Sequence, residues 1–397
     1  MSSRIQSIDI FRGLTILTMV FVNDLAGVRD IPAWTKHALE GTDSMTFVDV
    51  VFPAFLFIVG MSIPLALQRR KDRGDSMLIL WGHVLTRSFA LLVLGFFMVN
   101  MSRLNPTLAG MSHPVWALLF YAAVLALWTQ SGASGGKPRP VFWVTKAFGV
   151  ALIVLLAFLF RSGNASSPGW MTTQWWGILG LIGWTYLICS GFFLVFGQNI
   201  PAASALVTLA VCLYIGDKAG ALQCLGPVNN VLWLGGHVGG HVSIAGAGMI
   251  AGLLFMSGSP APTSSRRIRW ILGLGGVLAA GGFLLRPLYG ISKNMATPSW
   301  SLFSAAICCV VYVLLYWIAD LRRQGRLFAF SEPAGANPLL AYILPDIFYS
   351  GIALFGIEQL WWGAGDGLVG VLRSLLFSAA IVGITGYCTR RGLRLKL

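Results

Sequence analysis

The chain has 397 residues, of which 56% are hydrophobic and only 11% are charged, and its mean hydropathy is +0.75. Soluble domains carry about 25% charged residues, so this composition excludes a soluble globular protein. We attribute the net charge of +14 to basic residues in the cytoplasmic loops of a membrane protein. Nucleic acid is therefore not an expected partner. We therefore expect an all-α, polytopic integral membrane protein in contact with the lipid bilayer.

Apolar runs of about 17 to 25 residues, long enough to cross a bilayer, recur along the whole sequence. They predict ten to twelve transmembrane helices in a single membrane domain over residues 1–397. The twelve segments lie near residues 8–27, 47–67, 77–100, 113–130, 141–160, 174–196, 200–216, 241–257, 268–285, 299–319, 338–356 and 367–388. Segments 200–216 and 338–356 give the weakest signals, and the second contains Pro345 and Asp346.

The distribution of basic residues predicts the orientation. With the N-terminus in the cytoplasm, the inner loops and tails hold seventeen lysines and arginines, and the outer loops hold seven. This asymmetry obeys the positive-inside rule. Both termini are then cytoplasmic, and the inner basic residues contact anionic lipid.

Polar residues gather in the hairpin formed by the first two predicted helices, residues 5–67. They are Asp9, Arg12, Asn23, Asp24, His37, Glu40 and Asp49. Ionisable groups at the ends of membrane helices are costly unless they face a protein interior, so these residues are candidates for a functional site. The predicted topology places His37, Asn23 and Asp49 on the outer side.

Among the polar residues of this hairpin, His37 is the candidate catalytic residue. A histidine can take a proton from an amine or hydroxyl nucleophile, or carry an acyl group itself. It needs a partner that fixes its tautomer, and Asp49 is the nearest suitable carboxylate, with Glu40 and Asp24 as alternatives. The Asn23 amide is a candidate donor to a developing oxyanion. The alternative interpretation is an ordinary loop histidine and a helix-capping asparagine.

Several motifs occur in order: SIDIFRG, MVFVN, KHA and VDVVFPAFLFIVG within residues 4–67, TRSFALLVLGFF at 86–97, ISKN and WSL within 291–302, and GANPLLAY at 335–342. This pattern resembles the heparan-α-glucosaminide N-acetyltransferase family, above all its bacterial NagX-type members. Such membrane enzymes acetylate a terminal glucosamine on the far side of the membrane, using cytosolic acetyl-CoA. The resemblance implies a multi-pass protein of the bacterial inner membrane.

The resemblance also implies roles for individual residues. His37 matches the catalytic histidine, Asn23 the active-site asparagine, and Asp49 the matching aspartate. Weaker assignments are Asp9, Arg12, Arg87 and Asn337 toward acetyl-CoA, and Lys293 and Asn294 toward the acceptor; no metal site is expected. An ion pair between Arg12 and Asp9 is equally compatible with the sequence. Asn337 precedes Pro338, so helix capping also accounts for it.

Two functions follow as alternatives. The first is a transmembrane acetyltransferase acting on an amino sugar or related saccharide, by direct transfer or through acetyl-His37. The second is an amino-sugar transporter without acyl-transfer activity, since twelve helices with buried polar groups also suit a transporter. Residues 174–216 are predicted to form an additional helix pair near the acceptor entrance, and a homodimer is implied by the resemblance only.

Overall fold

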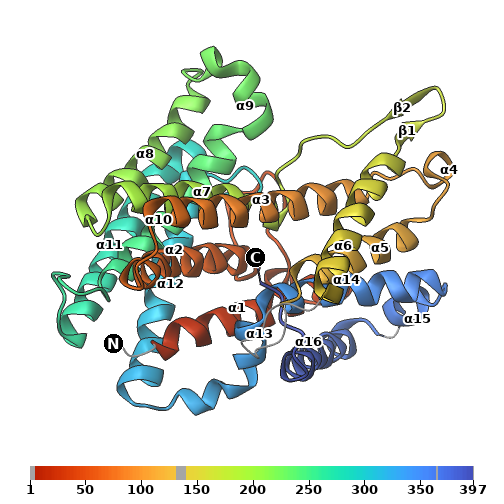
Figure 1. Ribbon diagram of the computed structural model, residues 1–397. Coiled ribbons are helices and arrows are strands. Elements are labelled where there is room, and N and C mark those ends of the chain that lie inside the picture. The colour runs from red at the N-terminus through yellow and green to blue at the C-terminus, as the bar shows by residue number, and fades with distance from the viewer. Residues whose placement is uncertain (1–4, 131–139, 364, 397) are drawn as a thin grey trace. The chain divides into compact units, whose positions relative to one another are not determined.

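The computed structural model describes residues 5–130, 140–363 and 365–396 (Figure 1). Arg4, Lys137 and Arg139, three of the residues that predict the orientation, lie outside this part of the chain. Among the described residues the only strands are β1 (Ser162–Asn164) and β2 (Ser167–Gly169), which pair antiparallel. The rest of the regular structure is helical, as the composition predicts.

The chain packs as two compact units. Unit 1 comprises the chain through Thr15, Pro32–Gly95 and Trp175–Ala329, and unit 2 comprises the described residues of Ile16–Ile31, Phe96–Gln174 and Phe330–Leu397. Helices α1 (Gln6–Leu25) and α3 (Met77–Met101) contribute residues to both units.

The remaining helices divide between the units. Those of unit 1 are α2 (Val48–Asp72), α7 (Ile178–Phe196), α8 (Ile200–Lys218), α9 (Gly226–Leu232), α10 (His241–Leu253), α11 (Ser264–Tyr289) and α12 (Pro298–Tyr316). Those of unit 2 are α4 (Pro106–Ala109), α5 (His113–Trp128), α6 (Pro140–Leu159), α13 (Glu332–Ala336), α14 (Pro338–Leu354), α15 (Glu358–Trp362) and α16 (Gly367–Arg390). Short 3-10 or π turns cover Ala33–Thr35, Gln223–Leu225, Leu234–Gly240, Trp317–Leu321 and Gly325–Ser331.

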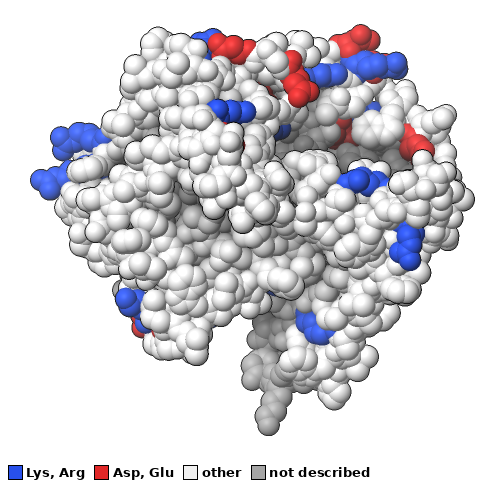
Figure 2. Space-filling view, turned by 90° about the horizontal axis from the view of Figure 1, so that it is seen from above, with Lys and Arg blue, Asp and Glu red and all other residues white. Residues whose placement is uncertain are grey.

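Each of the twelve predicted segments overlaps one of these helices, and segment 174–216 forms α7 and α8. By length and composition, eight of the described helices are able to cross a membrane, namely α2, α3, α6, α7, α8, α11, α12 with its π-helical end, and α16. Figure 2 shows that uncharged side chains make up most of the visible face. A multi-pass helical membrane protein is thus supported, while the count of twelve spans stays a prediction.

Helix α10 packs against α2 through glycines. Gly248 and Gly252 lie one turn apart on α10, against the backbone carbonyls of Phe57 and Met61 on α2. Every residue of α10 is buried. Small residues spaced four apart allow two membrane helices to approach at backbone distance, so these glycines set the spacing between α2 and α10.

We expect Gly248→Leu to lower the free energy of unfolding by about 1–3 kcal/mol or more, because a Cβ there overlaps the Phe57 carbonyl and the helices must separate. Gly276→Leu on α11 is the matched control, since a Cβ at Gly276 meets open space. Denaturant titration of the detergent-solubilised protein measures both. Equal stability of the two variants would contradict the close α2–α10 contact.

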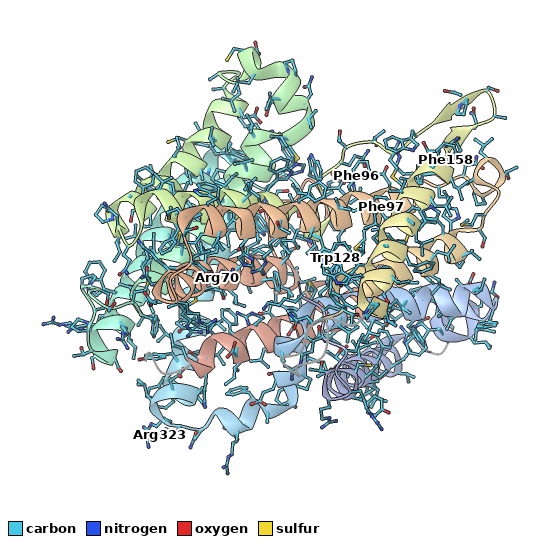
Figure 3. All side chains as sticks on the ribbon, in the orientation of Figure 1. Arg70, Phe96, Phe97, Trp128, Phe158 and Arg323 are labelled. Carbon is cyan, nitrogen blue, oxygen red and sulfur yellow. The ribbon has the colours of Figure 1, made fainter. Side chains whose placement is uncertain are left out.

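Unit 2 has an aromatic core. Phe97, labelled in Figure 3, stacks nearly parallel to two other rings. Its ring centroid is 5.9 Å from that of Trp116 and 5.4 Å from that of Phe120. Trp116 and Phe120 are completely buried, whereas Phe158 on α6 is 71% exposed. A large apolar side chain that is exposed on a membrane helix fits contact with lipid.

Candidate active site

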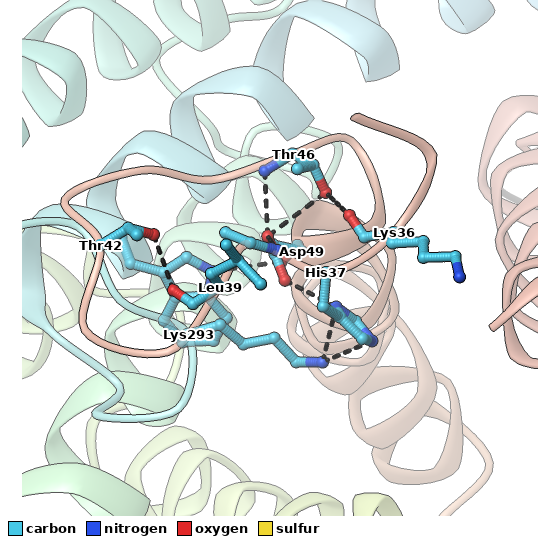
Figure 4. Close-up of polar contacts among 9 residues, drawn as sticks. Lys36, His37, Leu39, Thr42, Thr46, Asp49 and Lys293 are labelled. Carbon is cyan, nitrogen blue, oxygen red and sulfur yellow. Dashed lines mark hydrogen bonds and ion pairs between the residues drawn. The ribbon is translucent and has the colours of Figure 1, made fainter. Parts of the chain in front are cut away.

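His37 lies in the loop between α1 and α2, in the part of that loop that belongs to unit 1. Its Nδ1 atom is 2.7 Å from Oδ1 of Asp49, in the first turn of α2 (Figure 4). The Asp49 side chain is 2% exposed and the His37 side chain 46% exposed. The histidine is therefore held from the protein side and remains open on the other.

The second carboxylate oxygen of Asp49 is held by its own loop. Oδ2 accepts hydrogen bonds from the backbone N–H groups of Thr46 and Ala38, at 2.9 and 3.1 Å. This donor set matches an ionised carboxylate, which only accepts hydrogen bonds. We therefore assign the His37 proton to Nδ1, donated to Asp49, which leaves a lone pair on Nε2.

Lys293 approaches His37 from the loop between α11 and α12. Its Nζ is 3.1 Å from Nε2 and 3.3 Å from Nδ1 of His37 (Figure 4). Because Nδ1 is bonded to Asp49, Nε2 is the atom that accepts from the amine. Burial lowers the pKa of Lys293, and the charge of Asp49 partly offsets this by raising it. A cationic group is thus placed beside the lone pair of the candidate base.

Asp43 joins the two loops that carry His37 and Lys293. Its carboxylate accepts from Nε of Arg286 at 2.9 Å and from the backbone N–H of Ile291 at 2.7 Å. The hydrogen bond from Arg286 is the main cause that lowers the pKa of Asp43. The backbone of Asp49 has its own support, because Nε1 of the completely buried Trp300 donates to the Asp49 carbonyl at 3.1 Å.

Sequence reasoning assigned no role to Asp43, Arg286 or Trp300. Asp43 and Arg286 are 243 residues apart, and nothing local in either segment indicates the pairing. Trp300 had a signal, since it begins the WSL motif, but no chemical role could be read for an indole at that position.

The residues of unit 1 predicted to bind acetyl-CoA have protein partners. Arg12 lies 3.3 Å from Asp9 and donates to Oγ of Ser62 at 2.9 Å, so the ion pair weighed from the sequence is present. The Arg87 guanidinium lies over the Tyr186 ring at 4.6 Å, and its buried Nε has no hydrogen-bond partner within the described structure.

The predicted residues of unit 2 differ in their surroundings. Asn23 is exposed, while Asp24 is completely buried and bonded to Tyr349 and Ser374. Asp24 therefore accepts its hydrogen bonds within unit 2. The carboxylate that contacts His37 is that of Asp49. The catalytic role of Asn23 stays a prediction.

Asn337 does not cap α14 with its side chain. The completely buried Asn337 amide instead donates to Thr389 and to the Leu393 carbonyl, and accepts from the Leu395 N–H. It tethers the C-terminal segment, which corrects the capping interpretation. The contact of Asn337 with acetyl-CoA stays a prediction. Asn294 is exposed beside Lys293. The described residues contain no group of three or more His, Cys, Asp or Glu placed to hold a metal ion.

The lowered pKa of Lys293 predicts its reactivity. An ordinary lysine has a pKa near 10.4. The neutral, nucleophilic form of Lys293 should therefore appear at a lower pH than that of an ordinary lysine. The pH profile of amine acetylation by acetic anhydride, resolved by residue with mass spectrometry, measures this. Asp49→Asn should move the midpoint for Lys293 further down, because the carboxylate charge raises that pKa. An unshifted midpoint in the wild-type protein would contradict the buried contact with His37.

Fold and site together define a multi-pass membrane protein with a histidine–aspartate pair at the start of a candidate span. Residues 4–167 match a sequence family described as a domain of unknown function, DUF5009. The chain is 40% identical to the heparan-alpha-glucosaminide N-acetyltransferase of Mus musculus over 99 residues, which are 25% of this chain and 14% of that protein. Identity to the Homo sapiens enzyme is 41% over 97 residues, 24% of this chain and 14% of that protein.

A third relative is an uncharacterized protein of Mycobacterium bovis, 30% identical over 177 residues, which are 44% of this chain and 53% of that protein. The chain therefore spans about a seventh of the length of the acetyltransferases it matches. These similarities support the resemblance to a membrane N-acetyltransferase over part of the chain. The similarity to NagX-type members stays a prediction.

Proposed function

We propose that this protein is a transmembrane acetyltransferase. It moves an acetyl group from cytoplasmic acetyl-CoA to an amino sugar or related saccharide on the opposite side of the membrane. The observation that carries this proposal is the His37–Asp49 pair, with Nε2 of His37 left as the basic atom. The partial similarity to an N-acetyltransferase supplies the reaction class.

The geometry suits general-base catalysis. Asp49 keeps the proton on Nδ1, so Nε2 takes a proton from the acceptor amine as its nitrogen attacks the thioester carbonyl carbon. The new C–N bond forms, the C–S bond breaks, and His37 returns the proton to the departing CoA thiolate. In the two-step alternative Nε2 attacks the thioester carbonyl carbon, the C–S bond breaks and the CoA thiolate leaves. The acceptor amine then attacks acetyl-His37, the bond from the acetyl carbon to Nε2 breaks, and the amine proton passes to the thiolate.

Lys293 occupies the space that a substrate must enter. Its Nζ is within hydrogen-bond distance of Nε2, so the acceptor amine replaces it there. The released ammonium is then close to the carbonyl oxygen on which negative charge develops, and it stabilises that charge. In this proposal Lys293 serves the acceptor side, and Asn23 is assigned an oxyanion donor role from the resemblance alone.

Arg12 and Arg87 are proposed to contact the phosphates of acetyl-CoA by charge-assisted hydrogen bonds. In the part of the chain that the structure describes, the buried Nε of Arg87 has no hydrogen-bond partner, which supports this assignment. The Asp9 ion pair of Arg12 competes with it. The bacterial inner membrane and cytoplasmic termini are proposed from the resemblance and the positive-inside rule.

The test uses purified protein in sealed liposomes of known orientation. Radiolabelled acetyl-CoA is supplied on the side of the basic loops, and glucosamine on the other. We expect labelled N-acetylglucosamine on the far side, and a loss of roughly 10²- to 10⁴-fold in His37→Ala. His113→Ala at the start of α5 is the matched control, which should retain the rate.

Each result has a distinct meaning. Passage of unmodified glucosamine without acetylation would contradict the proposed acetyltransferase and favour an amino-sugar transporter. Equal acetylation by His37→Ala and wild-type protein would remove His37 from the mechanism.

A further inference from the structure

A groove in unit 1 lies between α8, the C-terminal end of α10 and α11, and it contains none of the residues proposed for catalysis. Its volume is about 700 Å³. Ile250 and Leu254 form a buried floor, while Trp270 and Val277 are exposed on its wall. Both α8 and α11 are candidate membrane spans with most of their residues outside the protein core. The groove is therefore open to lipid.

Two arginines lie at one end of this groove. Of the three arginines at the start of α11, Arg267 turns inward, with Nε donating to the Ala261 carbonyl and the guanidinium over the Phe255 ring. Arg266 and Arg269 instead line the groove. In the described structure neither forms an ion pair with an acidic side chain. Cations near a helix N-terminus oppose the helix dipole, so an anion between them would be stabilised.

The groove follows one face of α11. Arg266, Trp270, Gly273 and Val277 are spaced three to four residues apart and line it together, as expected of one helix face. At 1.5 Å per residue the distance from Arg266 to Val277 is about 16 Å. This is close to half of the roughly 30 Å hydrocarbon core of a bilayer, which is the depth that one leaflet provides.

We propose that this groove binds an anionic phospholipid. Its phosphate lies between Arg266 and Arg269, and an acyl chain runs along Trp270, Gly273 and Val277 over the floor formed by Leu254. Basic pockets between membrane helices on the cytoplasmic side bind anionic headgroups, and positive-inside asymmetry assigns these arginines to that side. A soluble anion would pair with the arginines but leave the apolar length of the groove unfilled. The inference does not depend on acetyl transfer.

The experiment titrates delipidated protein in detergent with dioleoyl phosphatidylglycerol and counts bound lipid by native mass spectrometry. Arg266→Gln/Arg269→Gln removes the headgroup site, and its control Arg69→Gln/Lys71→Gln removes two exposed charges at the end of α2. Gly273→Phe fills the groove and leaves its charges intact; its control is Gly276→Phe on the same helix. A Cβ at either glycine meets open space, so both variants should fold.

We expect the Kd for phosphatidylglycerol to rise roughly tenfold or more in the arginine variant, and likewise in Gly273→Phe, with both controls unchanged. Dioleoyl phosphatidylcholine should bind more weakly than phosphatidylglycerol. Equal affinity for the two lipids, or unchanged affinity in Gly273→Phe, overturns the proposal. If glycerol 3-phosphate or acetyl-CoA displaces the lipid at a concentration similar to the Kd of the lipid, the groove is a site for a soluble phosphate compound. That result also overturns the proposal.

Discussion

Asp49→Asn is expected to lower acetyl transfer by roughly 10³- to 10⁴-fold, the scale of effect seen when an orienting aspartate is replaced beside a catalytic histidine. Two backbone N–H groups point at Oδ2 of Asp49. In the variant only the amide oxygen accepts hydrogen bonds, so it turns to these donors and the NH₂ group faces His37. Nδ1 then accepts, the histidine proton moves to Nε2, and the basic lone pair is lost.

The liposome assay described above measures this rate, with thermal unfolding as a check that the variant folds. Glu40→Gln is the matched control, because Glu40 is an exposed carboxylate in the same loop and was a sequence-based alternative partner of His37. It should keep the wild-type rate. Similar losses in both variants would show that charge in the loop matters, and not the tautomer of His37.

Asp24→Ala is expected to lower the free energy of unfolding by about 3–5 kcal/mol, the cost of leaving a buried charge without its partner. Asp24 is completely buried in unit 2, where it accepts from Tyr349 and Ser374, both at 2.6 Å. Its Oδ2 is also 3.5 Å from Arg373, whose side chain is 10% exposed. Removing the carboxylate leaves that guanidinium enclosed beside the rings of Trp361 and Trp362.

Denaturant titration in detergent, followed by circular dichroism, measures this stability. Glu358→Ala removes an exposed carboxylate of unit 2 and should change it by no more than about 0.5 kcal/mol. The double variant Asp24→Leu/Arg373→Met should recover much of the loss, since replacing both members of a buried pair is often close to neutral. A double variant as unstable as Asp24→Ala would contradict the pairing of these two charges.

The membrane class and the helix positions could be predicted because both depend on local properties. A stretch of about twenty residues is enough to show the length and composition of an apolar run and the basic residues beside it. All twelve predicted segments overlap helices. Capping was less predictable. Asn337 had the sequence of an N-cap, but its buried amide binds the C-terminal segment more than fifty residues away.

From its composition and apolar runs, the sequence predicts a helical membrane protein with His37 in a polar loop between two of those runs. It left three carboxylates as possible partners for that histidine. The folded structure distinguishes them, because it places Asp49 at His37 and buries Asp24 with Tyr349 in unit 2. It also brought Lys293 to the imidazole across 256 residues of chain. Spacing along a chain constrains neighbours within a helix or turn, whereas contacts between distant loops depend on how the helices that carry them pack.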